Sequence, residues 1–354
     1  MSDISKIDKN FVINTNIGKD DICFYNVREN KFKVYGVFWE DGKYRRLPED
    51  TAKRISSEVY RLHARTAGGR VRFVTDSKYI AINTITGDPV RVSHFTLAGT
   101  TGFDMYVGNE YVKTFVPPYD MDHSYSGIME FDTNELREIT INFPLYSEVQ
   151  ELYVGLQKNA EIKEASPYKS EKPIVYYGSS ITMGGCASRP GRCYQNIVAR
   201  ELNYDYMNLG FSGSALAEDE MTEYMKGLEM SAFVFDYDHN APTPEYLQCT
   251  HEKMFCGLRE AHPDIPIIIM ARPKKKLTEA EKKRSKIIET TYRNAVARGD
   301  NKVAFIDGSM LTSMCADEGT IDGTHPTDLG FASMASAVSK VLKEMLEVVY
   351  EKNN

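Results

Sequence analysis

From residue 174 onward, short apolar runs alternate with longer amphipathic stretches, and this alternation limits the fold more than any other feature. The apolar runs have the length and composition of buried strands. They cover residues 174–178, 206–210, 232–237, 265–270 and 303–307. Helical patterns fill the gaps, near residues 194–202, 219–230, 244–261 and 278–297. Such an alternation predicts an α/β domain with a parallel sheet covered by helices on both faces.

The first part of the chain has a different pattern, in which aromatic and β-branched runs are separated by turn signals such as Asp41-Gly42 and Pro117-Pro118. Residues 139–143 alternate apolar and polar side chains, as a half-buried antiparallel strand does. Similar runs cover residues 11–13, 22–27, 34–39, 71–75, 79–85, 103–107, 111–115 and 152–156. Because no helical pattern is evident between them, we expect a β-sandwich of jelly-roll type, with Trp39 and Tyr44 in its core.

A polar, charged stretch at residues 156–172 separates the two patterns and is typical of a linker. The sequence therefore predicts an N-terminal sandwich over residues 1–165 and an α/β domain over residues 166–354. The linker is short and is not rich in Gly and Ser, so we expect the sandwich to dock against the second domain and help shape its cleft.

Composition excludes several classes of partner. The net charge is −7 and the isoelectric point is near 5.6, so no basic surface for nucleic acid is expected. No apolar run is long enough to span a membrane, and residues 1–10 are mostly polar, which favours a cytoplasmic protein. The 6 cysteines include no C-x-x-C pair, so we expect free thiols, no metal and no cofactor. The sequence indicates no oligomeric state.

Several strand ends and one loop carry the residues of a nucleophilic site. Ser180 follows the first predicted strand in Gly178-Ser179-Ser180-Ile181-Thr182. A serine hydroxyl needs a base and a group that orients the base. The loop Asp322-Gly323-Thr324-His325 supplies both, with an acid three residues before a histidine. The sites of open parallel sheets lie at the carboxyl ends of the strands, and Ser180, Gly213 and Asn240 all follow predicted strands, so we expect the site at this edge.

These blocks, with Asn208-Leu209-Gly210-Phe211-Ser212-Gly213 and Asp238-His239-Asn240 between them, resemble the motifs of the SGNH (GDSL-type) hydrolases. The resemblance implies Ser180 as nucleophile, His325 as base and Asp322 as its acid. It also implies an oxyanion hole made by the N–H groups of Ser180 and Gly213 and the side-chain amide of Asn240. Two positions depart from the family pattern: Ser179 stands in place of the usual Asp, and the third block lacks its usual Gly and second Asp.

The resemblance implies a serine esterase. A sandwich followed by an SGNH domain is similar to carbohydrate esterases that remove acetyl groups from plant polysaccharides or oligosaccharides, so we expect a small-molecule or oligosaccharide ester as substrate. A cytoplasmic location would favour imported oligosaccharides. Two alternatives stay open: a lipase or thioesterase of the same fold, and a non-catalytic carbohydrate-binding protein. Asp236, Asp238 and His239 are interpreted as structural, and Cys186 as a possible pocket residue rather than a nucleophile.

Overall fold

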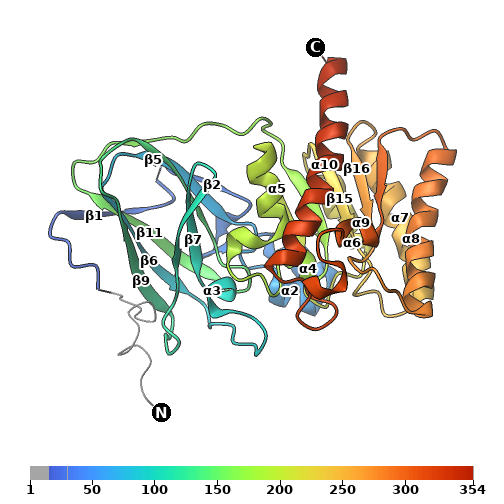
Figure 1. Cartoon of the computed structure of the whole chain (residues 1–354), viewed down its shortest axis with the longest axis horizontal. Helices are drawn as coiled ribbons and strands as arrows, with labels where there is room; N and C mark the ends of the chain where they lie inside the picture. Colours follow the sequence, from blue (N-terminus) through green and yellow to red (C-terminus); the bar gives the residue numbers. More distant parts are fainter. Residues whose placement is uncertain (1–15, 30, 354) are drawn as a thin grey trace.

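The computed structural model describes residues 16–29 and 31–353, and it has a β-rich half beside an α/β half (Figure 1). The strand expected at residues 11–13 lies outside the described residues. No helix in the described part of the chain is long and apolar enough to cross a membrane.

Two antiparallel sheets form the β-rich half. The first has the strand order β1 (Ile22–Asn26), β11 (Val149–Gln157), β6 (Tyr79–Thr86) and β9 (Ser124–Glu130). The second has the order β12 (Ile162–Lys163), β5 (Arg70–Thr75), β10 (Arg137–Asn142), β7 (Phe103–Val107) and β8 (Glu110–Phe115), and β2 (Lys33–Tyr35) also pairs with β5. Phe73 and Ile141 of one sheet and Ile82 and Leu152 of the other are fully buried in one core. The predicted sandwich is confirmed.

The α/β half contains a parallel sheet with the order β14 (Tyr206–Gly210), β13 (Ile174–Gly178), β15 (Ala232–Asp236), β16 (Ile267–Met270) and β17 (Val303–Ile306). On one face lie α5 (Tyr194–Leu202), α9 (Gly308–Leu311) and α10 (Asp328–Asn353). On the other lie α6 (Asp219–Lys226), α7 (Pro244–Ala261) and α8 (Glu279–Ala297). The predicted α/β architecture is confirmed. Helices cover both faces of the sheet because each strand points apolar side chains to both faces.

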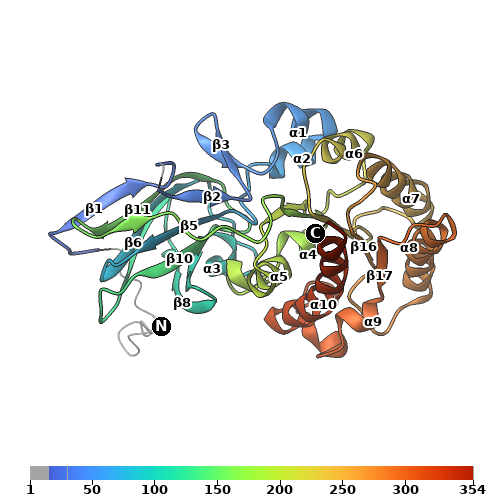
Figure 2. The same ribbon diagram turned by 90° about the horizontal axis from the view of Figure 1, so that it is seen from above.

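The expectation of a helix-free N-terminal part is wrong. It contains α1 (Glu49–Ile55), α2 (Ser57–Leu62) and the short α3 (Leu97–Thr100). Ser56 caps α2, because its side chain accepts a hydrogen bond from the N–H of Val59. The buried residues of α1 and α2 recur at helical spacing and pack into the core of the parallel sheet, beside α6 (Figure 2). The N-terminal part therefore completes one face of the α/β half.

Ion pairs and hydrogen bonds also join the two halves, as the docking prediction requires. The carboxylate of Asp104 on β7 is fully buried, and it accepts hydrogen bonds from Arg189 at 2.6 Å and from the N–H of Gly191 at 2.8 Å. Arg70 on β5 pairs with Asp205, just before β14. Because these charges are buried and paired, separating the halves would leave charged groups without partners.

One core assignment in the sandwich is wrong. Tyr44 is buried as expected, but the ring of Trp39 is 42% exposed. Trp39 lies on the hairpin formed by β3 (Phe38–Glu40) and β4 (Lys43–Arg45), outside both sheets of the sandwich. The guanidinium of Arg28 covers one face of the indole, 4.3 Å from its centre. A single aromatic residue in a strand pattern does not reveal which face of the strand will be covered.

We expect Leu62→Ala to lower the free energy of unfolding by about 2 to 5 kcal/mol, because Leu62 is buried in the core under the parallel sheet. Chemical denaturation of the full chain measures this loss. Leu136→Ala, at a leucine that is 51% exposed, is the matched control and should change stability by less than about 0.5 kcal/mol. Equal stability of the two variants would show that α2 is not part of the core.

Candidate active site

Ser180 begins α4 (Ser180–Met183), directly beyond the carboxyl end of β13. The side chain of Ser179 caps this helix by accepting a hydrogen bond from the N–H of Ile181 at 3.2 Å. The helix crosses closely above the strand ends, so a Cβ at Gly178 would collide with the carbonyl oxygen of Asp236 and the hydroxyl of Thr182. Glycine is needed at this position to let the helix approach the sheet.

Ser180, His325 and Asp322 form one hydrogen-bonded chain. The Oγ of Ser180 lies 2.9 Å from Nε2 of His325, and Nδ1 of His325 lies 2.7 Å from Oδ2 of Asp322. Ser180 is buried, whereas the side chain of His325 is 22% exposed. The structure thus brings together a hydroxyl, an imidazole and a carboxylate that lie far apart in the sequence, in the order that a nucleophile, a base and an orienting acid require.

Asp322 is held in its orientation by the backbone of its own loop. Its Oδ1 accepts hydrogen bonds from the N–H groups of Thr324 at 2.9 Å and of His325 at 2.8 Å. Partial burial by itself would raise the pKa of Asp322, but these bonds and the bond to the imidazole outweigh it and lower the pKa to about 2. The carboxylate is therefore ionised at any pH near neutrality, and it favours the tautomer in which His325 carries its proton on Nδ1.

Buried hydrogen bonds fix α4 to two neighbouring strands and to α5. The hydroxyl of Thr182 donates to Asp236 at the end of β15, 2.8 Å away, and Tyr194 donates to the same carboxylate at 3.1 Å. The carbonyl of Thr182 accepts from the amide of Asn208 on β14 at 2.7 Å and from Gln195 at 2.6 Å. Burial raises the pKa of Asp236 to about 7, against the effect of its two donors. Asp236 supports the helix that carries Ser180.

The predicted oxyanion donors follow neighbouring strands. Gly213 lies beyond β14 with φ of +75°, a left-handed conformation that favours glycine. Asn240 lies beyond β15, and its Oδ1 accepts a hydrogen bond from the N–H of Ala215 at 3.3 Å. This bond fixes the amide and leaves its NH₂ group for another acceptor. Within the described residues, the N–H groups of Ser180 and Gly213 have no hydrogen-bond acceptor either. The assignment of these three donors stays a prediction.

The N-terminal half supplies neighbours of the site that the sequence did not reveal. The hydroxyl of Tyr146 donates to the carbonyl of Ser180 at 3.4 Å. Phe95 packs against Tyr146 and lies 6.2 Å from His325 between ring centres, and His94 lies 5.9 Å from it. Arg46 is fully buried, and its Nη1 donates to the carbonyls at positions 208 and 210, both at 2.8 Å. Isolated residues in loops carry no periodic signal, so only the fold could place them.

The structure also shows the surroundings of Asp238 and Cys186, which the sequence suggested to be a structural residue and a pocket residue. Asp238 forms ion pairs with Arg272 at 2.6 Å and with Arg284 at 3.3 Å, which agrees with a structural role. Cys186 lies beside the site, in the loop after α4. Burial, followed by the negative charge of Asp322, raises the pKa of the Cys186 thiol to about 12. It is protonated near neutral pH and is therefore no competitor of Ser180 as nucleophile.

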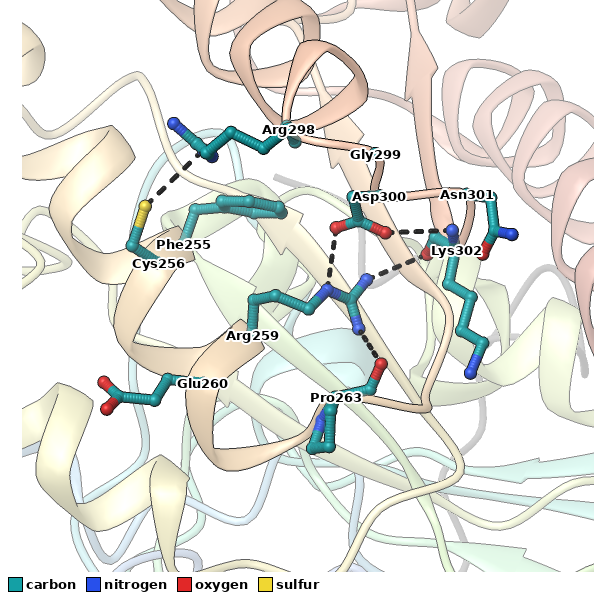
Figure 3. A pocket seen from close by; sticks show the side chains of 11 residues that line it. Phe255, Cys256, Arg259, Glu260, Pro263, Arg298, Gly299, Asp300, Asn301 and Lys302 are labelled. Atoms are coloured by element: carbon teal, nitrogen blue, oxygen red, sulfur yellow. Dashed lines mark hydrogen bonds and ion pairs between the residues drawn. The ribbon is translucent and has the colours of Figure 1, made fainter.

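A separate hollow lies between α7 and the turn that precedes β17 (Figure 3). This turn is at the amino end of β17, so the hollow is at the edge of the sheet opposite Ser180. Arg259 points into the hollow and donates to Asp300 at 2.8 Å and to the carbonyl of Lys302 at 3.0 Å. Arg298 is paired with Glu252 at 2.8 Å. Lys302 is paired with Asp264 at 2.5 Å. Because protein groups satisfy these three cations, none of the described cations that line the hollow is unpaired and able to attract an anionic ligand.

Comparison with known families agrees with this geometry. Residues 171–343 match the GDSL-like lipase/acylhydrolase family, and residues 22–162 match a family described as the N-terminus of SGNH-hydrolase-type esterases. The chain belongs to the SGNH (GDSL-type) hydrolase family. It is therefore an enzyme of the SGNH serine-esterase class, with the two-part organisation that these families describe. No curated protein matches the chain.

Several solved structures share both halves of this SGNH protein. A protein described as a GDSL-like lipase from Bacteroides ovatus superposes with a TM-score of 0.81 at 26% identity, covering 92% of this chain and 98% of the other. An active-site mutant of a family two carbohydrate esterase from Clostridium thermocellum gives 0.63 at 14% identity, covering 89% and 98%. An acetyl xylan esterase from Butyrivibrio proteoclasticus gives 0.61 at 14%, covering 92% and 98%. The last two similarities establish the fold alone.

Proposed function

We propose that this SGNH enzyme is a carbohydrate O-acetylesterase that uses Ser180, His325 and Asp322. The observation that carries the proposal is the unbroken hydrogen-bond chain from Oγ of Ser180 through His325 to Asp322. The solved carbohydrate esterases of the same two-part fold support the substrate class. The cytoplasmic location stays a prediction.

In the proposed mechanism, Nε2 of His325 accepts the proton of Ser180 while Oγ attacks the acetyl carbonyl. The N–H groups of Ser180 and Gly213 and the amide of Asn240 would stabilise the oxyanion, each contributing about 2.7 to 4 kcal/mol in the transition state. His325 then returns the proton to the departing sugar hydroxyl. Water attacks the acetyl-serine with His325 again as base, and acetate leaves. Asp322 stays ionised throughout and stabilises the imidazolium.

Asp322→Asn should lower kcat by about 10³- to 10⁴-fold. The amide can still accept the two backbone N–H bonds through its oxygen, so the loop should keep its shape. Its NH₂ group would then face Nδ1 of His325 and favour the tautomer with the proton on Nε2, which cannot accept a proton from Ser180. Steady-state kinetics on 4-nitrophenyl acetate measures the loss. Asp317→Asn, at another carboxylate close before this loop, is the control. A kcat within tenfold of wild type for Asp322→Asn would contradict the role of Asp322.

The surroundings of Ser180 favour a short acyl group. Gly185 follows α4, and a Cβ there would lie 2.9 Å from the hydroxyl of Tyr146, 3.2 Å from the ring of Phe95 and 3.2 Å from the carbonyl of Ser180. The loop, the two aromatic residues and the helix that carries Ser180 are thus in close contact at Gly185. A lipase instead needs an apolar surface, because each buried CH₂ contributes about 0.8 kcal/mol of binding.

We expect kcat/KM to fall from 4-nitrophenyl acetate to butyrate by at least about tenfold, since two further CH₂ groups would meet this packed wall instead of an apolar groove. Octanoate should be nearly inert. Ser180→Ala is the control and should remove turnover of every ester without lowering the melting temperature by more than a few degrees. A kcat/KM that rises with chain length would favour the lipase or thioesterase alternative.

A hollow on the N-terminal half is the candidate site for the sugar. Phe95 lines this hollow and also lies beside His325. The other residues that line the hollow are Val90, Arg91, Val92, Ser93, Leu97 and Tyr119. Tyr119 is 78% exposed, and Arg91 holds its loop by donating to the carbonyls of Tyr119 at 2.8 Å and Met121 at 3.0 Å. An exposed ring beside a guanidinium offers an apolar face and donors for a sugar.

Tyr119→Ala should raise KM for an acetylated oligosaccharide by about 5- to 10-fold, equivalent to about 1 to 1.4 kcal/mol of lost binding. The rate with 4-nitrophenyl acetate, which has no sugar, should change little. Tyr119→Phe keeps the ring and serves as the matched variant, with a KM close to that of wild type. If Tyr119→Ala leaves KM for the oligosaccharide unchanged, the sugar binds elsewhere.

A further inference from the structure

Three side chains from distant parts of the chain meet beside the nucleophile. His94 comes from the loop before α3, Cys186 from the loop after α4, and His325 from the loop before α10. One ligand atom of each lies within 4.8 Å of the other two. We propose that His94, Cys186 and His325 bind one zinc ion, which reversibly inhibits the enzyme.

The three donors match the chemistry of zinc. Zn²⁺ prefers imidazole nitrogen and cysteine sulfur, with bonds of about 2.0 to 2.3 Å. In a tetrahedral site such bonds place the ligand atoms about 3.5 Å apart. The present separations, which do not exceed 4.8 Å, would need to close by only about 1 Å. Three protein ligands leave the fourth position to water, as in zinc sites with an open position.

The orientation of His325 also suits a metal. Its Nδ1 is bonded to Asp322 at 2.7 Å, so the other ring nitrogen, Nε2, is the one directed into the site. Histidines that bind zinc commonly donate their second ring N–H to a carboxylate, which fixes the tautomer and strengthens the metal bond. Asp322 would act in this way. The pair that makes His325 a good base therefore also makes it a good zinc ligand.

His94 and Cys186 are both available to a metal. His94 is exposed, and within the described residues its ring has no hydrogen-bond partner. Cys186 is a free thiol, and its backbone has φ of +71°, in the left-handed region that few residues other than glycine adopt. Such strained conformations are concentrated at functional sites. The sulfur of Cys186 lies within 4.8 Å of a ring nitrogen of each of the two histidines.

Binding of one zinc ion would release one proton. The zinc ion accepts electron pairs from Nε2 of His325, from one ring nitrogen of His94 and from the sulfur of Cys186, whose thiol proton leaves to solvent. The lone pair on Nε2 is then no longer able to accept the proton of Ser180. This consequence rests on the proposed function, since it takes His325 to be the base. The metal is an inhibitor here and plays no part in turnover.

The test uses the purified full chain, freed of metal by a chelator, and has two readouts. Titration with Co²⁺ as a spectroscopic substitute for zinc should give one thiolate-to-metal charge-transfer band that saturates at one ion per chain. Zn²⁺ should inhibit hydrolysis of 4-nitrophenyl acetate, and EDTA should restore the rate. Each rate is expressed relative to the same protein without metal, so that a change in turnover itself does not count as a change in inhibition.

Cys186→Ser should abolish the cobalt band, and Cys186→Ser and His94→Ala should each weaken zinc inhibition by at least about tenfold. Cys249→Ser and His123→Ala change a thiol and an imidazole that lie outside the three-residue group, and both variants should respond like wild type. Ser180→Ala should keep the cobalt band although it turns over no ester. This last variant separates metal binding from the proposed function.

The proposal is overturned if wild-type protein shows no saturable thiolate band, or if Cys186→Ser and His94→Ala are inhibited by zinc as strongly as wild type. A saturable cobalt band in a protein without esterase activity would instead contradict the proposed function and support the metal site. Inhibition that is lost in Cys249→Ser would place the metal at the surface and would also overturn the proposal.

Discussion

The buried hydrogen bonds around Thr182 hold the catalytic edge of the molecule together. Its hydroxyl binds Asp236, and its carbonyl binds Asn208 and Gln195, so one residue of α4 is tied to two strands and to α5. Because these groups are buried, each unmade bond would cost about 1 to 3 kcal/mol. The Ser180 hydroxyl consequently has little freedom relative to the strand ends, and the positions of the other site residues are defined against it.

The N-terminal half belongs to the same structural unit. α1 and α2 cover one face of the parallel sheet, and the buried pair of Asp104 and Arg189 ties the sandwich to the segment that follows α4. Arg46 reaches from the end of β4 to two carbonyls of β14, just before the loop that carries Gly213. Burial lowers the pKa of Arg46 to about 9, which still leaves it charged at neutral pH. The backbone carbonyls of residues 208 and 210 compensate the charge of Arg46, and the hydrogen bonds hold these carbonyls in place.

This arrangement divides the groups around the candidate site into two sets. Ser180 lies at the carboxyl edge of the parallel sheet and His325 in the loop before α10. Tyr146, Phe95 and His94 reach the candidate site from the other half. The reacting groups lie on or next to regular elements, and the groups around them lie on loops that can vary without disturbing the sheet. His325 lies where the two sets meet, so it is exposed both to substrate and to other ligands of an imidazole.

The sequence by itself determined most of the secondary structure of the α/β half and pointed to the residues of the candidate site. Apolar residues recur with different periods in strands and in helices, so several elements could be assigned to within a residue. These are the strands at residues 174–178 and 206–210 and the helices at residues 194–202 and 244–261. The contact between Asp322 and His325 could be predicted because the two residues are three positions apart in one loop. The sequence also indicated the sandwich, but the absence of an evident helical pattern led it to miss α1 and α2. The buried residues of these helices, Ala52, Ile55, Val59 and Leu62, form only a short apolar pattern.

Only the tertiary structure decided which residues of the N-terminal half approach Ser180 and which aromatic side chains are covered. Trp39 and Tyr44 lie on the same hairpin, yet Trp39 is exposed and Tyr44 is buried. His94, Phe95, Tyr146 and Arg46 give no signal, because contacts between distant loops leave no period in the sequence. Their positions follow from how two sheets and a helix pair pack, and packing depends on shapes that exist only after the chain has folded.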